Sequence, residues 1–205
     1  MKRPGVGIDF AIAAFMTGLF KVTLVLMAVE LLLIAPIKKT SADGVKPKAE
    51  FYITIDWGTD RDTDIDIWIK DVGNNEIIWF NRKEGTYVTL DRDVLGDFNN
   101  MVAGINGKIS RVNEEMVTIR SLANDEYIVN AVLYSDHGHA DGAAVEPVPF
   151  TIRLVKLNPV MKVVTEVSGV ANYIKQEVHV FRFSVEGGEV SDVNSDRPEY
   201  IMSAK

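Results

Sequence analysis

The chain has 205 residues, which is room for one membrane anchor and one domain of ordinary size. It contains no cysteine, which excludes disulfides, cysteine-based zinc sites and a thiol nucleophile. Residues 1–49 carry a net charge of +4 and residues 50–205 a net charge of −11. Because binding along nucleic acid needs a positive surface, the acidic part is not expected to bind it.

The first predicted element is a single transmembrane helix within residues 10–37. This segment is 28 residues long and contains two charges, Lys21 and Glu30, whereas a spanning helix needs about 20 apolar residues. A cleaved signal peptide is the alternative, but its apolar region is shorter. We therefore expect residues 1–37 to hold an N-terminal segment and a retained anchor, and residues 38–50 to be a polar linker.

The charges in the anchor predict contact with a partner. Glu30 follows Lys21 by nine residues, about 13 Å along a helix, so the two do not pair within it. In one interpretation Lys21 extends to the lipid headgroups and Glu30 meets a polar group on a neighbouring helix. In the other, Glu30 lines an ion path between subunits together with Lys21 or Asp9.

Beyond residue 50 the sequence alternates with a period of two, which indicates β-strands. The predicted strands are EFYITIDW, TDIDIWIKD, NEIIWFN, TYVTLDR, EMVTIRS, EYIVNAVLYS, PFTIRLVKL, MKVVTEVSG and QEVHVFRFSVE. Glycine and asparagine turns separate them, and no long helix interrupts them. This pattern predicts a mainly β chain, with an antiparallel β-sandwich of the jelly-roll type over residues 51–190. Two loops, residues 93–113 and 135–147, interrupt it, and residues 191–205 form a docked or frayed tail.

The stretch TDRDTDIDIWIKD, residues 59–71, allows two interpretations. Alternation places Ile65 and Ile67 on one face of a strand and Asp64 and Asp66 on the other, which predicts a solvated acidic face. The alternative is a calcium site completed by a second loop, because calcium takes six to eight oxygen ligands. Its candidate ligands are Asp56, Asp60, Asp62, Asp64 and Asp66.

A second candidate metal site lies in SDHGHADG, residues 135–142. Its candidate ligands are Asp136, His137, His139 and Asp141, which suit zinc or copper. A polar loop without metal is the alternative interpretation. The sequence contains no nucleophile, phosphate-binding or metalloprotease motif, so no enzymatic activity is expected. No cofactor is expected either, with calcium as the possible exception.

The residues IDWGTDRDTDIDIWIKDVGNNEIIWFNRKEGTYVTLDRD, with ANDEYIVNAVLYSD and PVPFTIRLV further on, resemble the β-domain of YfaP-like proteins. The matching elements are Asp64, Asp66, Trp68 and Asp71; Phe80, Asn81 and Arg82; Gly85; and Tyr127 with Tyr134. The resemblance covers about residues 51–157. It implies a β-sandwich module that is often exported, and it carries over no catalytic residues. The sequence Asn124-Asp125-Glu126 departs from the Pro-Gly turn common in that family, and residues 93–113 are an insertion.

The segment LFKVTLVLMAVELLLIAPIKK resembles the single helix of TolR/ExbD/MotB-type stator partners. That resemblance covers about twenty residues. It implies a multi-helix partner similar to TolQ, ExbB or MotA. The helices of that family carry an aspartate as proton carrier, whereas Lys21 stands at the nearest position here. Proton-driven function is therefore in question even where the architecture is shared.

These features predict a non-enzymatic, single-pass, oligomeric protein of the bacterial inner membrane, an accessory or stator-like subunit with a periplasmic β-sandwich for docking or sensing. The N-terminus is expected in the cytoplasm, although the two positive residues before the helix and the four after it favour the reverse orientation. One alternative is a tethered module that binds calcium, glycan or envelope material. Another is a virion or envelope protein that forms a homo-oligomeric ring.

Overall fold

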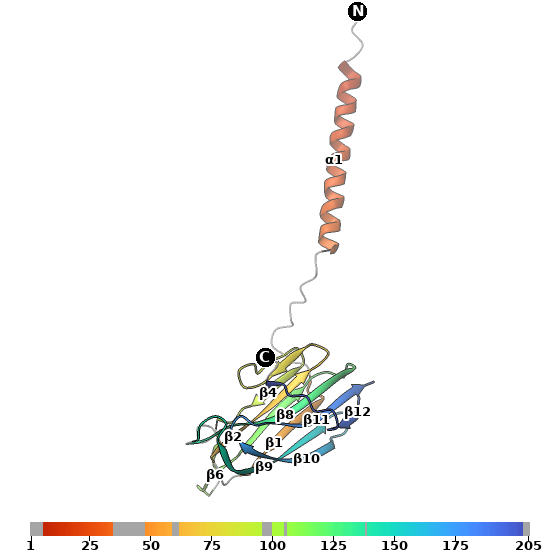
Figure 1. The fold of residues 1–205 in the computed structure, drawn as a ribbon. Helices are drawn as coiled ribbons and strands as arrows, with labels where there is room; N and C mark the ends of the chain where they lie inside the picture. Colours follow the sequence, from red (N-terminus) through yellow and green to blue (C-terminus); the bar gives the residue numbers. More distant parts are fainter. Residues whose placement is uncertain are drawn as a thin grey trace, which may run out of the picture. The chain divides into compact units, whose positions relative to one another are not determined.

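The structure is a computed structural model. It describes the backbone of residues 6–34, 48–58, 62–95, 100–104, 106–137 and 139–202, and within the helix it describes the side chains of residues 12–27. The chain divides into two compact units, Met1–Lys46 and Pro47–Lys205, and each is described by itself below (Figure 1).

The first unit contains the helix α1, Val6–Ile34, with 29 residues. Leucine, alanine and methionine, all strong helix formers, supply 12 of its 29 residues, and no proline interrupts it. All described side chains of α1, residues 12–27, are exposed. Among the residues that the structure describes, no helix has the length and apolar character needed to cross a membrane. The side chains of Asp9 and Glu30 lie outside the described residues, whereas Lys21 is exposed.

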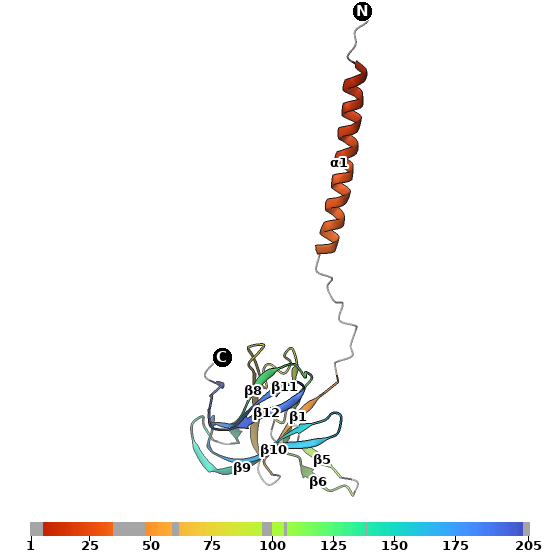
Figure 2. The ribbon, with the colours of Figure 1, turned by 90° about the vertical axis from the view of Figure 1, so that its right-hand side faces the viewer.

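The second unit consists of antiparallel strands in two five-stranded sheets (Figures 1 and 2). The first sheet has the order β10-β9-β1-β7-β4 and the second β12-β11-β8-β2-β3. The first sheet comprises β1 (Phe51–Asp56), β4 (Val88–Arg92), β7 (Glu114–Ile119), β9 (Ala144–Lys156) and β10 (Lys162–Tyr173). The second comprises β2 (Thr63–Asp71), β3 (Glu76–Ile78), β8 (Asp125–Asp136), β11 (Glu177–Glu186) and β12 (Glu189–Asn194).

One hydrophobic core lies between the two sheets. The alternating residues Phe51, Ile53 and Ile55 of β1 are fully buried in it. Ile65 and Ile67 of β2, in the other sheet, are buried in the same core. Each such side chain contributes about 1.5–3 kcal/mol by leaving water. Inward-facing residues of two antiparallel sheets sharing one core confirm the predicted mainly β architecture of a sandwich.

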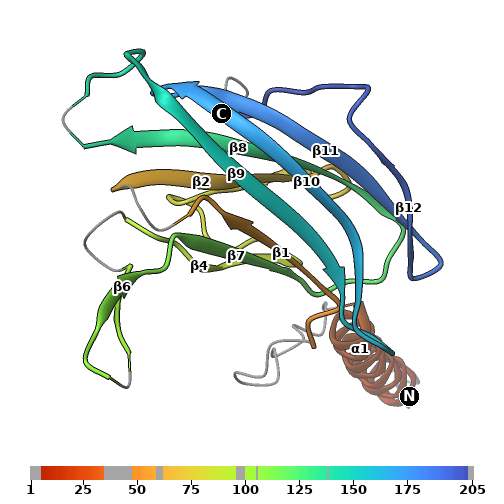
Figure 3. The ribbon, with the colours of Figure 1, turned by 90° about the horizontal axis from the view of Figure 1, so that it is seen from below.

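The prediction that residues 93–113 form a loop was wrong. This segment contains a two-stranded hairpin, β5 (Met101–Ala103) with β6 (Ile109–Arg111). It forms a separate sheet, seen beside the sandwich in Figure 3. The short strands escaped the alternation pattern because both of their faces are exposed, so no apolar face had to repeat. Strand β12 also runs to Asn194, four residues beyond the expected end of the sandwich.

A second, smaller cluster of buried residues covers the outer face of the sheet that contains β2. It comprises Trp68, Ile128, Val132 and Ile201, with the partly buried Ile77, Trp79, Phe80 and Met202 packed against them. Trp68 alternates with the core residues Ile67 and Ile69, so it points to the other side of the sheet. The outer face of β2 is therefore covered by protein, and part of the cover is the C-terminal segment.

Candidate cation-binding site

The candidate site forms where an edge of β2 meets the opposite sheet. Strand β3 pairs with β2 only at residues 69–71, so β2 has no strand partner on that side before Ile69 in the described structure. Glu115 lies on β7 of the other sheet, on the same face of the strand as the core residues Val117 and Ile119. Glu115 therefore points from one sheet toward the uncovered edge of the other.

The carboxylate of Glu115 joins three segments. Its Oε2 accepts a hydrogen bond of 2.7 Å from the backbone amide of Ile67. Its Oε1 accepts one of 3.3 Å from the amide of Val94, in the segment after β4. Glu115 is fully buried. Its oxygens thus satisfy an edge amide of β2 that strand pairing leaves open.

Asp64 and Asp66 lie beside Glu115. One carboxylate oxygen from each of the three residues lies within 4.8 Å of the others. The exposed fractions are 5% for Asp64, 2% for Asp66 and 0% for Glu115. In the described part of the chain, Asp64 Oδ1 and Asp66 Oδ2 are buried without a hydrogen-bond partner. We call these three residues the acidic cluster.

Burial dominates the electrostatics of the acidic cluster. It raises the pKa of Asp64 to about 7, with the charge of Asp93 as the next cause. It also raises the pKa of Asp66 well above its usual value, and the neighbouring charge of Asp64 adds to the shift. The pKa of Glu115 is likewise raised well above the ordinary range by burial and then by Asp66. Three carboxylates so close together, out of water, retain their charges only if a cation compensates them.

The cations that the structure places nearby are engaged with other groups. Lys83 Nζ lies 2.5 Å from Asp93 Oδ2, and the Lys83 side chain is half exposed. Lys175 Nζ lies 3.1 Å from the ring centre of Tyr134. Lys175 lowers the pKa values of Asp64 and Asp66, but less than burial raises them. Neither lysine cancels the charge of the acidic cluster.

The donor atoms of the acidic cluster suit a hard divalent cation. All are carboxylate oxygens, which calcium, magnesium and manganese prefer, and neither histidine nor cysteine is among them. Asp64 Oδ1 and Asp66 Oδ2 are buried without a hydrogen-bond partner, and a hydrogen bond from the Trp68 side chain to the Asp66 carboxyl lowers the pKa of Asp66 without offsetting burial. The Glu115 oxygens each keep a second lone pair beside the amide that they accept. The residues present therefore fit a bound cation.

The structure corrects the expectation that Asp64 and Asp66 form a solvated face. Alternation placed them correctly on the side of β2 away from the core, but Trp68 and the segments packed on it cover that side. Glu115 then reaches the same edge from the opposite sheet. Both aspartates are buried there, which the strand pattern alone did not predict.

The other predicted calcium ligands do not join the acidic cluster. Asp56 is exposed at the end of β1, where it accepts a hydrogen bond of 3.2 Å from the Gly58 amide. Asp60 lies outside the described residues. Asp62 is half-buried, 3.4 Å from His137 Nε2. Its charge raises the pKa of Asp64, so Asp62 borders the cluster without belonging to it.

The candidate zinc or copper loop does not converge in the structure. His137 faces Asp62, whereas His139 Nδ1 lies 3.6 Å from Asp136 Oδ2. Asp141 is exposed. Where side chains are described, the acidic cluster is the one group of three metal-ligating residues brought together. The loop residues thus behave as surface groups of a turn.

Sequence reasoning missed Glu115 and the adjacent Asp93. Glu115 stands 48 positions after Ile67 in the chain, and nothing local marks it as a partner of β2. One signal was available: Glu115 interrupts the apolar, inward-facing positions of its strand. A charge at such a position is rarely tolerated without a partner.

Comparisons with known proteins gave no match: no protein family, no curated protein and no solved structure is significantly similar to this chain.

Proposed function

We propose that this chain is a non-enzymatic cation-binding module, in which Asp64, Asp66 and Glu115 hold one divalent cation. The observation that carries the proposal is the pair of buried carboxylate oxygens without partners, Asp64 Oδ1 and Asp66 Oδ2, beside a third buried carboxylate. Buried charges in proteins are paired or coordinate a metal. A cation would supply the missing partner and join both sheets at this edge.

Calcium is the cation that we propose for the acidic cluster. Calcium–oxygen distances of about 2.3–2.6 Å place ligands on opposite sides of the ion up to about 5 Å apart. The oxygens of the acidic cluster, all within 4.8 Å of one another, lie within that span. Magnesium, with distances of about 2.0–2.1 Å, prefers a near-octahedral shell with several retained waters, which a buried cluster of carboxylates suits less well. Calcium also accepts the irregular geometry that two strands from different sheets impose.

The test is the thermal stability of the full chain in mild detergent, first in EDTA and then with calcium in excess. A ligand that binds only the folded state stabilises it, by about 2.7 kcal/mol at 100 times its dissociation constant. We expect Tm to rise by several degrees with calcium and by less with magnesium. Isothermal titration should give one site per chain.

Two sets of variants complete this test. Asp66→Asn and Glu115→Gln keep the size of the side chain but remove a ligand charge, so each should abolish the calcium-dependent rise. Asp56→Asn is the matched control, because Asp56 is exposed and outside the cluster; it should respond to calcium as the unmodified chain does. A Tm that stays constant with calcium, magnesium and manganese at millimolar concentration would show that the cluster holds protons instead.

We propose in addition that residues 10–37 tether the module to a membrane, with the sandwich on the periplasmic side. The support is the surface of α1: its large apolar side chains between Ile12 and Met27 are all more than half exposed. A helix that is apolar all round is normally covered by protein or lipid. Retention of the full chain in the membrane fraction after a carbonate wash, and its release on removal of residues 1–46, tests the tether.

A stator-like role in a membrane complex is the second candidate, and Lys21 is the observation that favours it. Lys21 is a charged residue in the middle of the apolar surface of α1, where a charge is costly unless it meets a polar group. Under this proposal the chain co-purifies in mild detergent with a multi-helix membrane protein similar to TolQ or ExbB, and Lys21→Leu weakens that association. Purification of the chain without any such protein would contradict it.

A further inference from the structure

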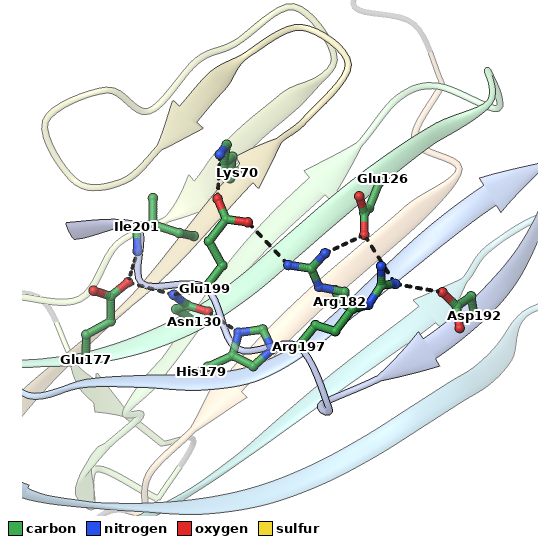
Figure 4. A network of polar contacts seen from close by, with 10 residues as sticks. All are labelled: Lys70, Glu126, Asn130, Glu177, His179, Arg182, Asp192, Arg197, Glu199 and Ile201. Carbon is green, nitrogen blue, oxygen red and sulfur yellow. Dashed lines mark hydrogen bonds and ion pairs between the residues drawn. The ribbon is translucent and has the colours of Figure 1, made fainter. Parts of the chain in front are cut away.

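The C-terminal segment Glu199–Met202 lies across the outer face of the sheet formed by β11, β8 and β2, as Figure 4 shows from close by. None of these four residues belongs to a strand, so no ladder of backbone hydrogen bonds holds them. Side chains of the sandwich contact the segment instead. This arrangement resembles the way in which a protein groove binds a peptide.

The backbone of the segment is bound by two side chains. The carboxylate of Glu177 accepts hydrogen bonds from the amide of Ile201 at 2.5 Å and from the amide of Met202 at 3.0 Å. Asn130 Nδ2 donates to the carbonyl oxygen of Glu199 at 2.7 Å and to Glu177 Oε1 at 2.6 Å. His179 Nδ1 lies 2.8 Å from Asn130 Oδ1. The sandwich therefore holds both of these groups in place.

Two side chains of the segment are bound specifically. The Glu199 carboxylate receives Lys70 Nζ at 2.5 Å and Arg182 Nη2 at 3.2 Å. Ile201 is fully buried in the cluster that contains Trp68. Tyr200, between them, is 56% exposed. These contacts are complementary to an acid at the first position and an aliphatic residue at the third, and they leave the second exposed to solvent.

The residues that connect β12 to the segment, 195–198, are not buried against the sheet as the segment is. Residues 195–198 are exposed and follow the last strand. Among the contacts of the described residues, Arg197 anchors this stretch, at 3.1 Å from Asp192 Oδ2 and 3.9 Å from Glu126 Oε1 (Figure 4). A specifically bound segment behind a short exposed connection is the arrangement that permits exchange between identical chains.

We propose that this groove is a peptide-binding site for the segment Glu-Tyr-Ile-Met, and that it accepts the same segment from a second copy of the chain. The second copy is the occupant because it carries the same four residues, so every contact described above can re-form. Exchange keeps these contacts, and it requires that the segment leave its own sandwich and that two copies be close together. None of the side chains that bind the segment belongs to the acidic cluster, so the test of this site needs no added cation.

A complementation experiment tests the exchange with full-length chains in mild detergent. One chain carries Glu177→Gln, which impairs the groove, and the other carries Ile201→Ala, which impairs the segment. We expect a differently tagged 1:1 mixture to associate, because the second chain offers an intact groove and the first an intact segment. Neither variant should self-associate to the same extent. Equal association in the mixture and in each variant alone, or none in the mixture, would overturn the proposal.

A labelled peptide of residues 195–205 tests the site independently of assembly. It is titrated against full-length chain with Ile201→Ala, whose own segment is weakened, and fluorescence anisotropy is measured. We expect saturable binding, weaker by about tenfold or more for a peptide with the same Ile201→Ala change. A peptide with Tyr200→Ala is the matched control and should bind as the unmodified peptide does. Absence of binding up to millimolar peptide would overturn the site itself.

Discussion

Glu115 and Ile67 connect the two sheets by a hydrogen bond of 2.7 Å between a carboxylate oxygen and a backbone amide. Ile67 belongs to β2 and Glu115 to β7, at the edge where β2 lacks a strand partner in the described structure. The Glu115 side chain thus accepts the hydrogen bond from a β2 amide that a neighbouring strand would accept elsewhere in the sheet. The same carboxylate lies beside Asp64 and Asp66, where we propose that it binds a cation. Substitutions of Glu115 measured without cation report only on its hydrogen bond to Ile67.

Glu115→Ala should destabilise the domain in EDTA by about 3 kcal/mol, because it leaves the buried amide of Ile67 unsatisfied and opens a cavity. Glu115→Gln should cost less, since its amide oxygen still accepts from Ile67. Urea denaturation followed by tryptophan fluorescence measures both. If the alanine variant were as stable as the unmodified chain, the bond between the sheets would not be a stabilising contact.

Without cation, stability should fall as pH rises from about 5 to about 7. Asp64, Asp66 and Glu115 have raised pKa values in the folded state, so the folded chain binds protons more tightly than the unfolded chain. Their contribution is complete below the unfolded pKa of about 4 and is lost as pH passes the folded pKa, about 7 for Asp64. Each pKa unit corresponds to about 1.4 kcal/mol.

The measurement is the free energy of unfolding in EDTA at several pH values. Asp64→Asn should flatten the decline, because it removes one titrating group. Glu199 acts in the opposite direction, since Lys70 lowers its pKa, but its effect is confined to pH below about 4.5. Calcium should remove the decline by binding the ionised carboxylates. His179, whose pKa is lowered by burial, opposes this decline up to about pH 6.5, so the decisive comparison is between the unmodified chain and Asp64→Asn. An equal pH dependence of the two in EDTA would contradict the raised pKa of Asp64.

Arg182→Met should destabilise the domain by about 2 kcal/mol or more. The Arg182 side chain is 10% exposed and pairs with Glu126 at 2.8 Å and with Glu199 at 3.2 Å. Removing it leaves two partly buried carboxylates without this partner, which is costly. Arg153→Met is the matched control: Arg153 pairs with Glu166 on an exposed surface, where ion pairs add little. Urea denaturation should show no measurable change for this control, and equal effects of the two variants would contradict the burial of Arg182.

Gly169→Ala should destabilise the sandwich by about 1–3 kcal/mol, the usual cost of overpacking. A Cβ atom at Gly169 of β10 would meet the ring of Phe150, which is buried on the paired strand β9. Ser168→Ala is the control, because Ser168 is exposed and its change should leave Tm almost unaltered. Thermal denaturation distinguishes the two, and a Gly169→Ala chain with unchanged Tm would show that the ring moves freely aside.

The sequence by itself determined the class of the fold and the inward face of most strands. Alternation in β1 and β2 predicted which residues enter the core, because successive side chains of a strand point to opposite sides. It also placed Asp64 and Asp66 correctly on the outer side of β2. Period-two reasoning failed for the hairpin of β5 and β6, which buries neither face and so leaves no pattern to detect.

Only the tertiary structure decided what lies beyond that outer side. Alternation states toward which side a residue points, but whether that side meets water or protein depends on segments far away in the chain. Ile201 covers Trp68 from the C-terminal end, and Glu115 reaches Ile67 from the opposite sheet. Asp64 and Asp66 are buried beside Glu115, and burial turns acids that water would have solvated into candidate ligands for a cation.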